Sequence, residues 1–136
     1  MIIKQLSVFV ENKSGRLAEV TELIAQSGIN INALSIADTT DFGILRIVVD
    51  RVEESAALLR ANSMTVSVCD IISIDLDDRP GKLAEALRVL SENGIFIEYV
   101  YAYSSPGKGG LARVVIRVDD TVRADECLRK AGFKYH

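Results

Sequence analysis

The chain has 136 residues, an apolar fraction of 49%, a charged fraction of 26% and a net charge of −3. These values are typical of a globular protein and provide no basic surface for nucleic acid or an anionic membrane. The one histidine is His136, so we expect neither histidine-based catalysis nor a metal site. Cys69 and Cys127 are isolated, which indicates no disulfide framework. No apolar run approaches the roughly 20 residues of a membrane span and no secretion signal is evident, so we expect a cytoplasmic protein without a cofactor.

The first half of the chain predicts six elements in the order strand, helix, strand, strand, helix, strand. Apolar residues alternate from Leu6 to Val10, as in a half-buried strand. Leu17, Val20 and Ile24 then follow at helical spacing. The remaining features that we expect are an N-cap at Ser14, a left-handed C-cap at Gly28, strands over 29–37 and 43–50 around a turn from Asp38 to Asp41, a helix over 52–59 and a strand over 64–68.

The second half of the chain repeats the first. Gly15-Arg-Leu-Ala-Glu19 recurs as Gly81-Lys-Leu-Ala-Glu85 at an offset of 66 residues, and the glycine and isoleucines of 28–31 recur at 94–97. We match Arg46–Val49 with 113–116 at an offset of 67, and Leu59-Arg60 with 128–129 at 69. The sequence therefore predicts an internal duplication with insertions in two of its connections.

The second copy predicts the same elements with a shortened end. We expect strands over 72–76, 95–103 and 111–118, helices around 83–90 and 122–131, and a final strand of only about four residues. Apolar residues keep one parity across 64–76, so the closing strand of copy 1 continues into copy 2. We therefore place one domain at 1–70 and another at 71–136, with their sheets side by side. The order βαββαβ predicts an α+β chain of two ferredoxin-like units.

The turn from the first strand to the first helix is the candidate site of each copy. Free amides at a helix start suit a carboxylate or another small anion. Gly15 and Gly81 leave room for a ligand at the backbone, and Asn12 or Asp78 can accept hydrogen bonds from an ammonium group. One loop would then bind both ends of an amino acid. The alternative is that these residues only shape and cap the turn.

Two pairs of segments resemble the ACT domain signature, and together they extend the resemblance across nearly the whole chain. One pair is Asp77-Asp-Arg-Pro-Gly-Lys-Leu-Ala84 with Gly94-Ile-Phe-Ile97, and the other is Ser14-Gly-Arg-Leu-Ala18 with Gly28-Ile-Asn-Ile-Asn32. The resemblance implies tandem ACT modules that bind amino acids or related metabolites and regulate an enzyme. Ligands of this family commonly lie between the strand–helix loop of one module and the sheet of another. Carried over by position, the ligand-binding residues are Asn12, Ser14, Gly15, Arg16, Leu17, Asn30, Ile31, Asn32, Asp78, Pro80, Gly81, Lys82, Leu83, Glu98 and Tyr99.

The two sites differ in chemistry. Pro80 lacks the amide that Ser14 has, and the charged Asp78 replaces Asn12. Glu98 likewise replaces Asn32. We therefore predict that the amino acid binds preferentially to copy 1.

Three further features have simpler interpretations. Tyr99, Tyr101 and Tyr103 share one sheet face, but without basic charge this predicts packing or a dimer contact and not RNA binding. Arg46 and Arg113 have two interpretations, arginines that cross an interface and the commoner solvated strand arginines, and we expect the second. The glycine-rich segment Ser104 to Gly110 joins two strands and opens no helix, so we expect a hairpin and no phosphate loop.

We therefore expect a non-enzymatic homodimeric sensor that binds a small amino acid or related metabolite, with an enzyme as its partner. An alternative is a ligand-free interaction module that acts as the regulatory subunit of a metabolic enzyme. A small enzyme is a third hypothesis, for which the sequence shows no convergent acid, base and nucleophile.

Overall fold

The computed structural model describes residues 1–38, 41–104 and 109–135. Two residues of the expected turn Asp38 to Asp41, most of the expected Ser104 to Gly110 hairpin, and His136 lie outside these residues. The chain separates into two compact units, which we call the N-terminal unit (Lys4–Cys69) and the C-terminal unit (Met1–Ile3 and Asp70–His136). No helix within the described residues is both long enough and apolar enough to cross a membrane.

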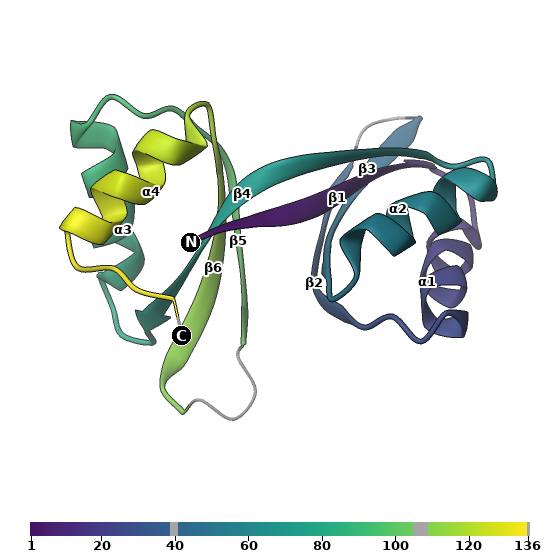
Figure 1. The fold of residues 1–136 in the computed structure, drawn as a ribbon, viewed down its shortest axis with the longest axis horizontal. Helices are drawn as coiled ribbons and strands as arrows, with labels where there is room; N and C mark the ends of the chain where they lie inside the picture. The colour runs from purple at the N-terminus through teal and green to yellow at the C-terminus, as the bar shows by residue number, and fades with distance from the viewer. Residues whose placement is uncertain (39–40, 105–108, 136) are drawn as a thin grey trace. The chain divides into compact units, whose positions relative to one another are not determined.

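Ten helices and strands make up the described chain (Figure 1). In chain order they are β1 (Ile2–Glu11), α1 (Arg16–Gln26), β2 (Ile31–Asp38), β3 (Phe42–Val49), α2 (Val52–Ala61), β4 (Thr65–Asp77), α3 (Lys82–Glu92), β5 (Ile97–Ser104), β6 (Leu111–Val118) and α4 (Thr121–Lys130).

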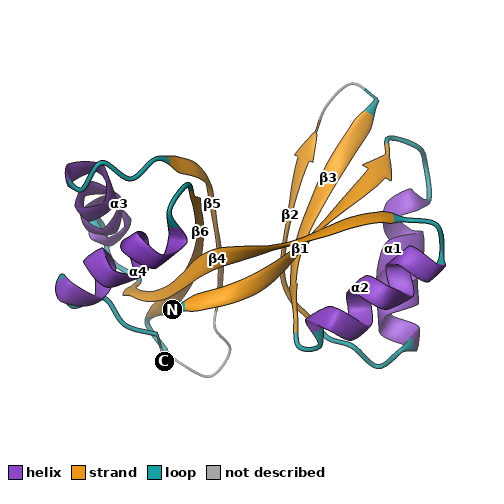
Figure 2. Cartoon of the chain, turned by 45° about the horizontal axis from the view of Figure 1, so that its top comes forward, coloured by secondary structure: helices purple, strands orange, loops and turns teal. Residues whose placement is uncertain are grey.

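The N-terminal unit has the predicted βαββαβ order and strand neighbours β2-β3-β1-β4. Its two helices pack beside each other on one side of the sheet (Figure 2). The apolar residues of β1 that alternate along the strand point to this side, and they form the core with residues of α1, β3 and α2. The core includes Leu6, Ile24, Leu45, Ile47 and Leu59, each no more than 1% exposed. The ferredoxin-like prediction is confirmed.

The C-terminal unit repeats this arrangement with strand neighbours β5-β6-β4 and the first residues of β1. β4 is unbroken from Thr65 to Asp77, as the shared parity of its apolar residues predicts. The expected final strand is reduced to a single bridge between Lys134 and Asp75. Beside that bridge, the amide of Ser73 donates to the carbonyl of Met1 at 2.8 Å. The vacant strand position is thus partly filled from the other end of the chain.

Strand register corrects how the two copies align. Leu6 pairs with Ile47, and its equivalent Ile72 pairs with Ile116, so the offset at β3 and β6 is 69 and not 67. Two equivalent hydrogen bonds give the same offset of 69. The Asp50 carboxylate accepts a hydrogen bond from the Asn30 amide, and the Asp119 carboxylate accepts one from the Phe96 amide. All three extra residues therefore lie in the β5–β6 connection, and the link to the last helix keeps its length. Arg46 and Arg113 are not equivalent, because Ile44 corresponds to Arg113.

Candidate functional site

The strand–helix turn of the N-terminal unit is shaped by glycine and by backbone hydrogen bonds. The Asn12 amide donates to the Asp41 carbonyl at 3.0 Å, which ties the turn to the start of β3. Gly15 is the N-cap of α1 in the left-handed conformation, with φ 86° and ψ −11°. The expected N-cap at Ser14 is therefore wrong, and no side chain caps this helix. Glycine adopts a left-handed conformation without the cost that a Cβ brings, so it is the residue suited to this position.

The turn of the C-terminal unit has the same backbone with different residues. Gly81 is the N-cap of α3, with φ 90° and ψ −15°. The Asp78 amide donates to the Gly110 carbonyl at 2.8 Å, which matches the bond from Asn12 to Asp41 at the corrected offset. At both Gly15 and Gly81 an added Cβ would meet no atom of the described residues within 4 Å. With respect to these residues each turn leaves room for a ligand to approach the backbone.

Several amides of the first turn have no internal acceptor. Within the described residues, the amides of Ser14, Gly15, Leu17 and Ala18 form no hydrogen bond to the protein. These groups lie at the positive end of the helix dipole, where a carboxylate is stabilised. The second turn offers one amide fewer, because Pro80 replaces Ser14. Since the turn does not use the amide at this position, proline leaves the backbone unchanged and removes one donor.

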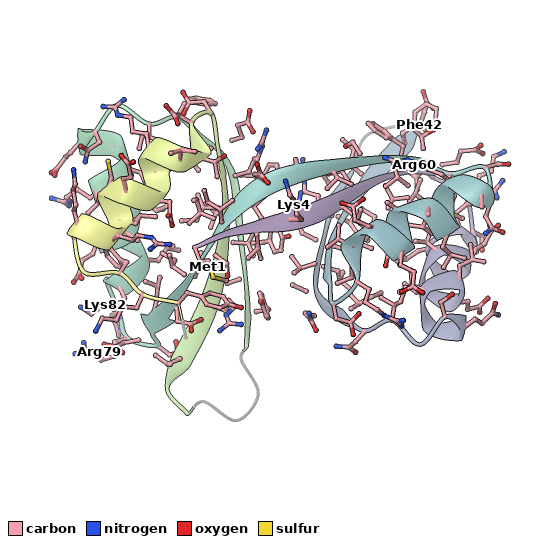
Figure 3. The ribbon with its side chains drawn as sticks, viewed as in Figure 1. Met1, Lys4, Phe42, Arg60, Arg79 and Lys82 are labelled. Carbon is pink, nitrogen blue, oxygen red and sulfur yellow. The ribbon has the colours of Figure 1, made fainter. Side chains whose placement is uncertain are left out.

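Both turns carry the same pattern of charges at an offset of 66. In the N-terminal unit Lys13 pairs with Glu11 and Arg16 with Glu19, each at 3.0 Å. The hydrogen bond from Lys13, the charge of Lys13 and then that of Arg16 lower the pKa of the Glu11 carboxyl. The equivalent pairs of the C-terminal unit are Arg79 with Asp77 at 3.0 Å and Lys82 with Glu85 at 2.9 Å, and Figure 3 labels both of these basic residues.

A cavity of about 160 Å³ lies beside the first turn. It joins Asn12, Arg16 and Leu17 to the side chains of Ile36 on β2 and Leu45 on β3. The turn thus has a polar rim next to an apolar wall, which suits a small molecule with a charged end and an apolar side chain. Leu17 is 41% exposed and its equivalent Leu83 is 42% exposed, so each turn presents a leucine at its surface.

The second group of predicted residues lies away from the turn. Ile31 pairs with Val49, whereas the turn lies by Gly43, six residues along β3 and about 20 Å away at strand spacing. The Asn30 side chain donates to the Asn32 side chain at 2.7 Å. The structure therefore brings Asn12, Ser14, Gly15, Arg16 and Leu17 together, but it does not bring Asn30, Ile31 and Asn32 to them within the unit.

The equivalent strand residues of the C-terminal unit make different contacts. The Glu98 carboxylate accepts from Arg117 at 2.9 Å. The ring of Tyr99 stacks on that of Tyr101, with centroids 6.4 Å apart, so the prediction that these tyrosines share a face is confirmed. Glu98 and Tyr99 lie at the start of β5, as Asn30 to Asn32 lie at the start of β2. That end of the strand is remote from the turn residues Asp78, Pro80, Gly81, Lys82 and Leu83.

The sequence reasoning missed a polar cluster on the C-terminal sheet. Arg113 donates to both oxygens of Asp75, at 2.7 and 3.0 Å, and it also stacks on the ring of Tyr135. The Arg113 side chain is 12% exposed and that of Asp75 is fully buried. Arg113 is therefore not the solvated arginine that we expected. An aspartate within the apolar run of β4, opposite an arginine of β6, was the available signal.

No group of three or more histidine, cysteine, aspartate or glutamate side chains is placed to hold a metal ion in the described part of the chain.

Comparison with known proteins identifies the family. A family model described as an ACT domain pair matches residues 1–135. The crystal structure of protein BT0572 from Bacteroides thetaiotaomicron superimposes with a TM-score of 0.92, at 42% identity over 98% of this chain and 91% of that chain. The regulatory subunit of aspartate kinase from Thermus thermophilus shares the fold, with a TM-score of 0.68 at 14% identity over 97% of both chains.

Curated relatives match part of the chain. The acetolactate synthase small subunit of Haemophilus influenzae is 32% identical over 69 residues, which cover 51% of this chain and 42% of that protein. That of Buchnera aphidicola is 22% identical over 94 residues, covering 69% and 59% respectively. The chain thus spans about half the length of the curated relatives that it matches. The expected ACT resemblance is confirmed over the whole described chain, and the protein belongs to the ACT domain pair family.

Proposed function

We propose that this protein is a non-enzymatic regulatory subunit or sensor that binds a small free amino acid at its strand–helix turns. The observation that carries the proposal is the set of four amides, those of Ser14, Gly15, Leu17 and Ala18, that have no acceptor among the described residues, next to Asn12 and a cavity with an apolar wall. The amides and the helix dipole suit the ligand carboxylate, while the Asn12 side-chain oxygen suits its ammonium group. Leu17 and Ile36 would contact its side chain.

Binding would act through the equilibrium between arrangements of modules. A ligand that binds one arrangement more tightly raises the population of that arrangement, and a partner enzyme can respond to the change. The curated relatives named as acetolactate synthase small subunits and the solved regulatory subunit of aspartate kinase support an enzyme of amino-acid metabolism as the partner. Asn30 to Asn32, Glu98 and Tyr99 remain candidates for residues that a second module contributes, in a homodimer.

A thermal-shift screen of the twenty amino acids tests the proposal. A ligand that binds only the folded chain raises the melting temperature by mass action. Calorimetry of the Asn12→Ala and Asp78→Ala variants then shows which turn binds the amino acid more tightly. We expect the larger loss of affinity from Asn12→Ala. A larger loss from Asp78→Ala would reverse the ranking.

A second candidate function is a ligand-free interaction module. Leu34 is 53% exposed and Ile36 is 49% exposed on β2, which is the last strand at one edge of the sheet. An edge strand whose one charged residue is Asp38 at its end, and which has exposed apolar residues, is suited to a protein partner. The absence of any melting shift with the twenty amino acids would contradict amino-acid binding and favour this function.

A further inference from the structure

Gly43 is a glycine at a backbone position that does not require one. It follows Phe42, which Figure 3 labels at the start of β3, and it pairs in regular register with Val10 on β1 and Asp38 on β2. Its φ lies outside the left-handed region, and no bulge interrupts the two ladders beside it. Glycine within a strand weakens the strand, and it often marks a bulge or the close approach of another backbone or a ligand.

A methyl group at Gly43 would fit without strain. An added Cβ would lie 3.7 Å from the Ile36 Cγ2 atom, 3.8 Å from the Ala37 carbonyl oxygen and 3.9 Å from the Val10 carbonyl oxygen. These are ordinary van der Waals distances, so the neighbouring strands do not approach too closely for a side chain. Neither conformation nor crowding by the neighbouring strands therefore explains the glycine.

The C-terminal unit carries a side chain at the same position. Ala112 on β6 pairs with Leu76 on β4, as Gly43 on β3 pairs with Val10 on β1. The two units thus share the strand and its register, and one of them has a methyl group that the other lacks. The fold accepts both residues, so the reason for glycine lies in the space that it leaves open.

That space belongs to the cavity of about 160 Å³ beside the first turn, which Gly43 lines. Alternate residues of a strand face the same side, so Gly43 faces the side of the buried Leu45, which lines the same cavity. A methyl group at Gly43 would therefore occupy part of the cavity. Among the described residues, the apolar side chains of the lining are all aliphatic and belong to Val10, Leu17, Ile36 and Leu45.

Volume and charge both restrict the ligand side chain that this cavity can hold. Liquid water occupies about 30 Å³ per molecule, so a cavity of about 160 Å³ has room for roughly five atoms of that size. This space suits an aliphatic side chain of up to about four carbons. The charged residues of the rim are already paired, Lys13 with Glu11 and Arg16 with Glu19, each at 3.0 Å. A charged ligand side chain would have to displace one of these partners.

We propose that Gly43 determines the length of the amino-acid side chain that the first turn accepts. The ligand is an amino acid with an uncharged aliphatic side chain of up to about four carbons. This side chain enters beside Leu17 and Ile36 and ends against the bare backbone of Gly43. The proposal rests on the amino-acid binding proposed for this turn, and it adds the class of ligand and the residue that selects it.

Calorimetry of the full chain with unbranched amino acids tests the proposal, because such a series varies only side-chain length. The ligands are alanine, 2-aminobutyrate, norvaline and norleucine, whose side chains have one to four carbons. We expect the affinity of the natural chain to rise along the series. In Gly43→Ala we expect norleucine to bind about tenfold more weakly and alanine to bind as before, because one methylene in an apolar pocket changes affinity by about this factor.

The outcomes separate this proposal from the function on which it rests. An equal loss for alanine and norleucine, or no loss for either, would overturn the role of Gly43 and leave amino-acid binding intact. Binding of a charged or aromatic amino acid in place of this series would overturn the ligand class. The proposed function itself fails only when no amino acid raises the melting temperature of the natural chain, and the present proposal then fails with it.

Melting temperatures separate the loss of space from a loss of folding. Gly43→Ala restricts the unfolded chain and introduces no strain, so we expect an equal or higher melting temperature together with the weaker norleucine binding. Ala112→Gly is the matched control, because it makes the reciprocal change in the C-terminal unit. We expect it to lower the melting temperature and leave norleucine affinity unchanged. A lower melting temperature of Gly43→Ala with weaker binding of all four ligands would show that Gly43 serves folding, and would overturn the proposal.

Discussion

The two strand–helix turns have the same backbone although they share few side chains. Gly15 and Gly81 differ by only 4° in φ and 4° in ψ, and each turn is tied to the neighbouring hairpin by one backbone bond. Ser14 and Pro80 occupy one position without altering this geometry. Glycine and main-chain hydrogen bonds therefore determine the turn, and the other side chains are free to diverge. This freedom allows one fold to carry two sites of unequal specificity.

The sheets below the turns differ more strongly. Phe9 pairs with Ile44 in the N-terminal unit, whereas the equivalent pair of the C-terminal unit is Asp75 with Arg113. One unit thus has an apolar pair where the other has a buried ion pair. A buried ion pair contributes little net stability compared with an apolar pair, but it becomes costly when one partner is removed.

The largest expected effect comes from breaking this ion pair. Arg113→Ile leaves the buried Asp75 carboxylate without its bidentate partner, and we expect a loss of about 3 kcal/mol in the free energy of unfolding. The double variant Asp75→Phe with Arg113→Ile imports the pair of the N-terminal unit, and we expect it to come within about 1 kcal/mol of the natural chain. Urea unfolding measures both. A double variant no more stable than the single one would show that the two sheet positions are not interchangeable.

The next effect concerns the glycines that the two turns share. Gly15→Ala and Gly81→Ala each place a Cβ in open space but in a left-handed conformation, so we expect each to cost about 1 kcal/mol. Gly109→Ala is the matched control, because that glycine has equally open surroundings and no positive φ. Thermal unfolding of the three variants measures the costs. Unequal losses at the two turns would contradict the equivalence of their backbones.

The elements of both units could be predicted because their apolar residues alternate or recur at helical spacing, and because Gly28 and Gly94 mark the helix ends. The offset between β3 and β6 could not, since the run that starts at Arg113 resembles the run that starts at Arg46, whereas strand pairing sets Arg46 in the place of Val115. The cap at Gly15 was missed because serine is the commoner N-cap, and here the chain enters the helix from a left-handed residue. The partial replacement of the final strand by Met1 depends on a contact between distant parts of the sequence, which no local pattern encodes.

Exchange of the residue before the shared glycine sharpens the comparison of the two turns. Ser14→Pro should change the free energy of unfolding by less than about 0.5 kcal/mol, because the Ser14 amide forms no bond that the turn needs. The same variant removes one donor, so we expect roughly fivefold weaker binding of whichever amino acid raises the melting temperature. Calorimetry measures the affinity, with Pro80→Ser as the reciprocal variant. Weaker folding without weaker binding would show that this residue serves the turn alone.

The smallest effect distinguishes the two units at alkaline pH. Burial raises the pKa of the Tyr103 phenol, partly offset by its hydrogen bond to Arg113. As the pH rises through the ordinary tyrosine pKa of about 10, Tyr103 loses its proton more readily in the unfolded chain than in the folded one. The unfolded state then binds fewer protons than the folded state, so the free energy of unfolding falls as the pH rises. The equivalent residue of the N-terminal unit is Ala37, which does not titrate, so this dependence belongs to the C-terminal unit.

Urea unfolding over a series of alkaline pH values should show a shallower decline of the free energy of unfolding for Tyr103→Phe than for the natural chain. The other three tyrosines are present in both proteins, so parallel curves would mean that Tyr103 does not contribute to the alkaline loss of stability.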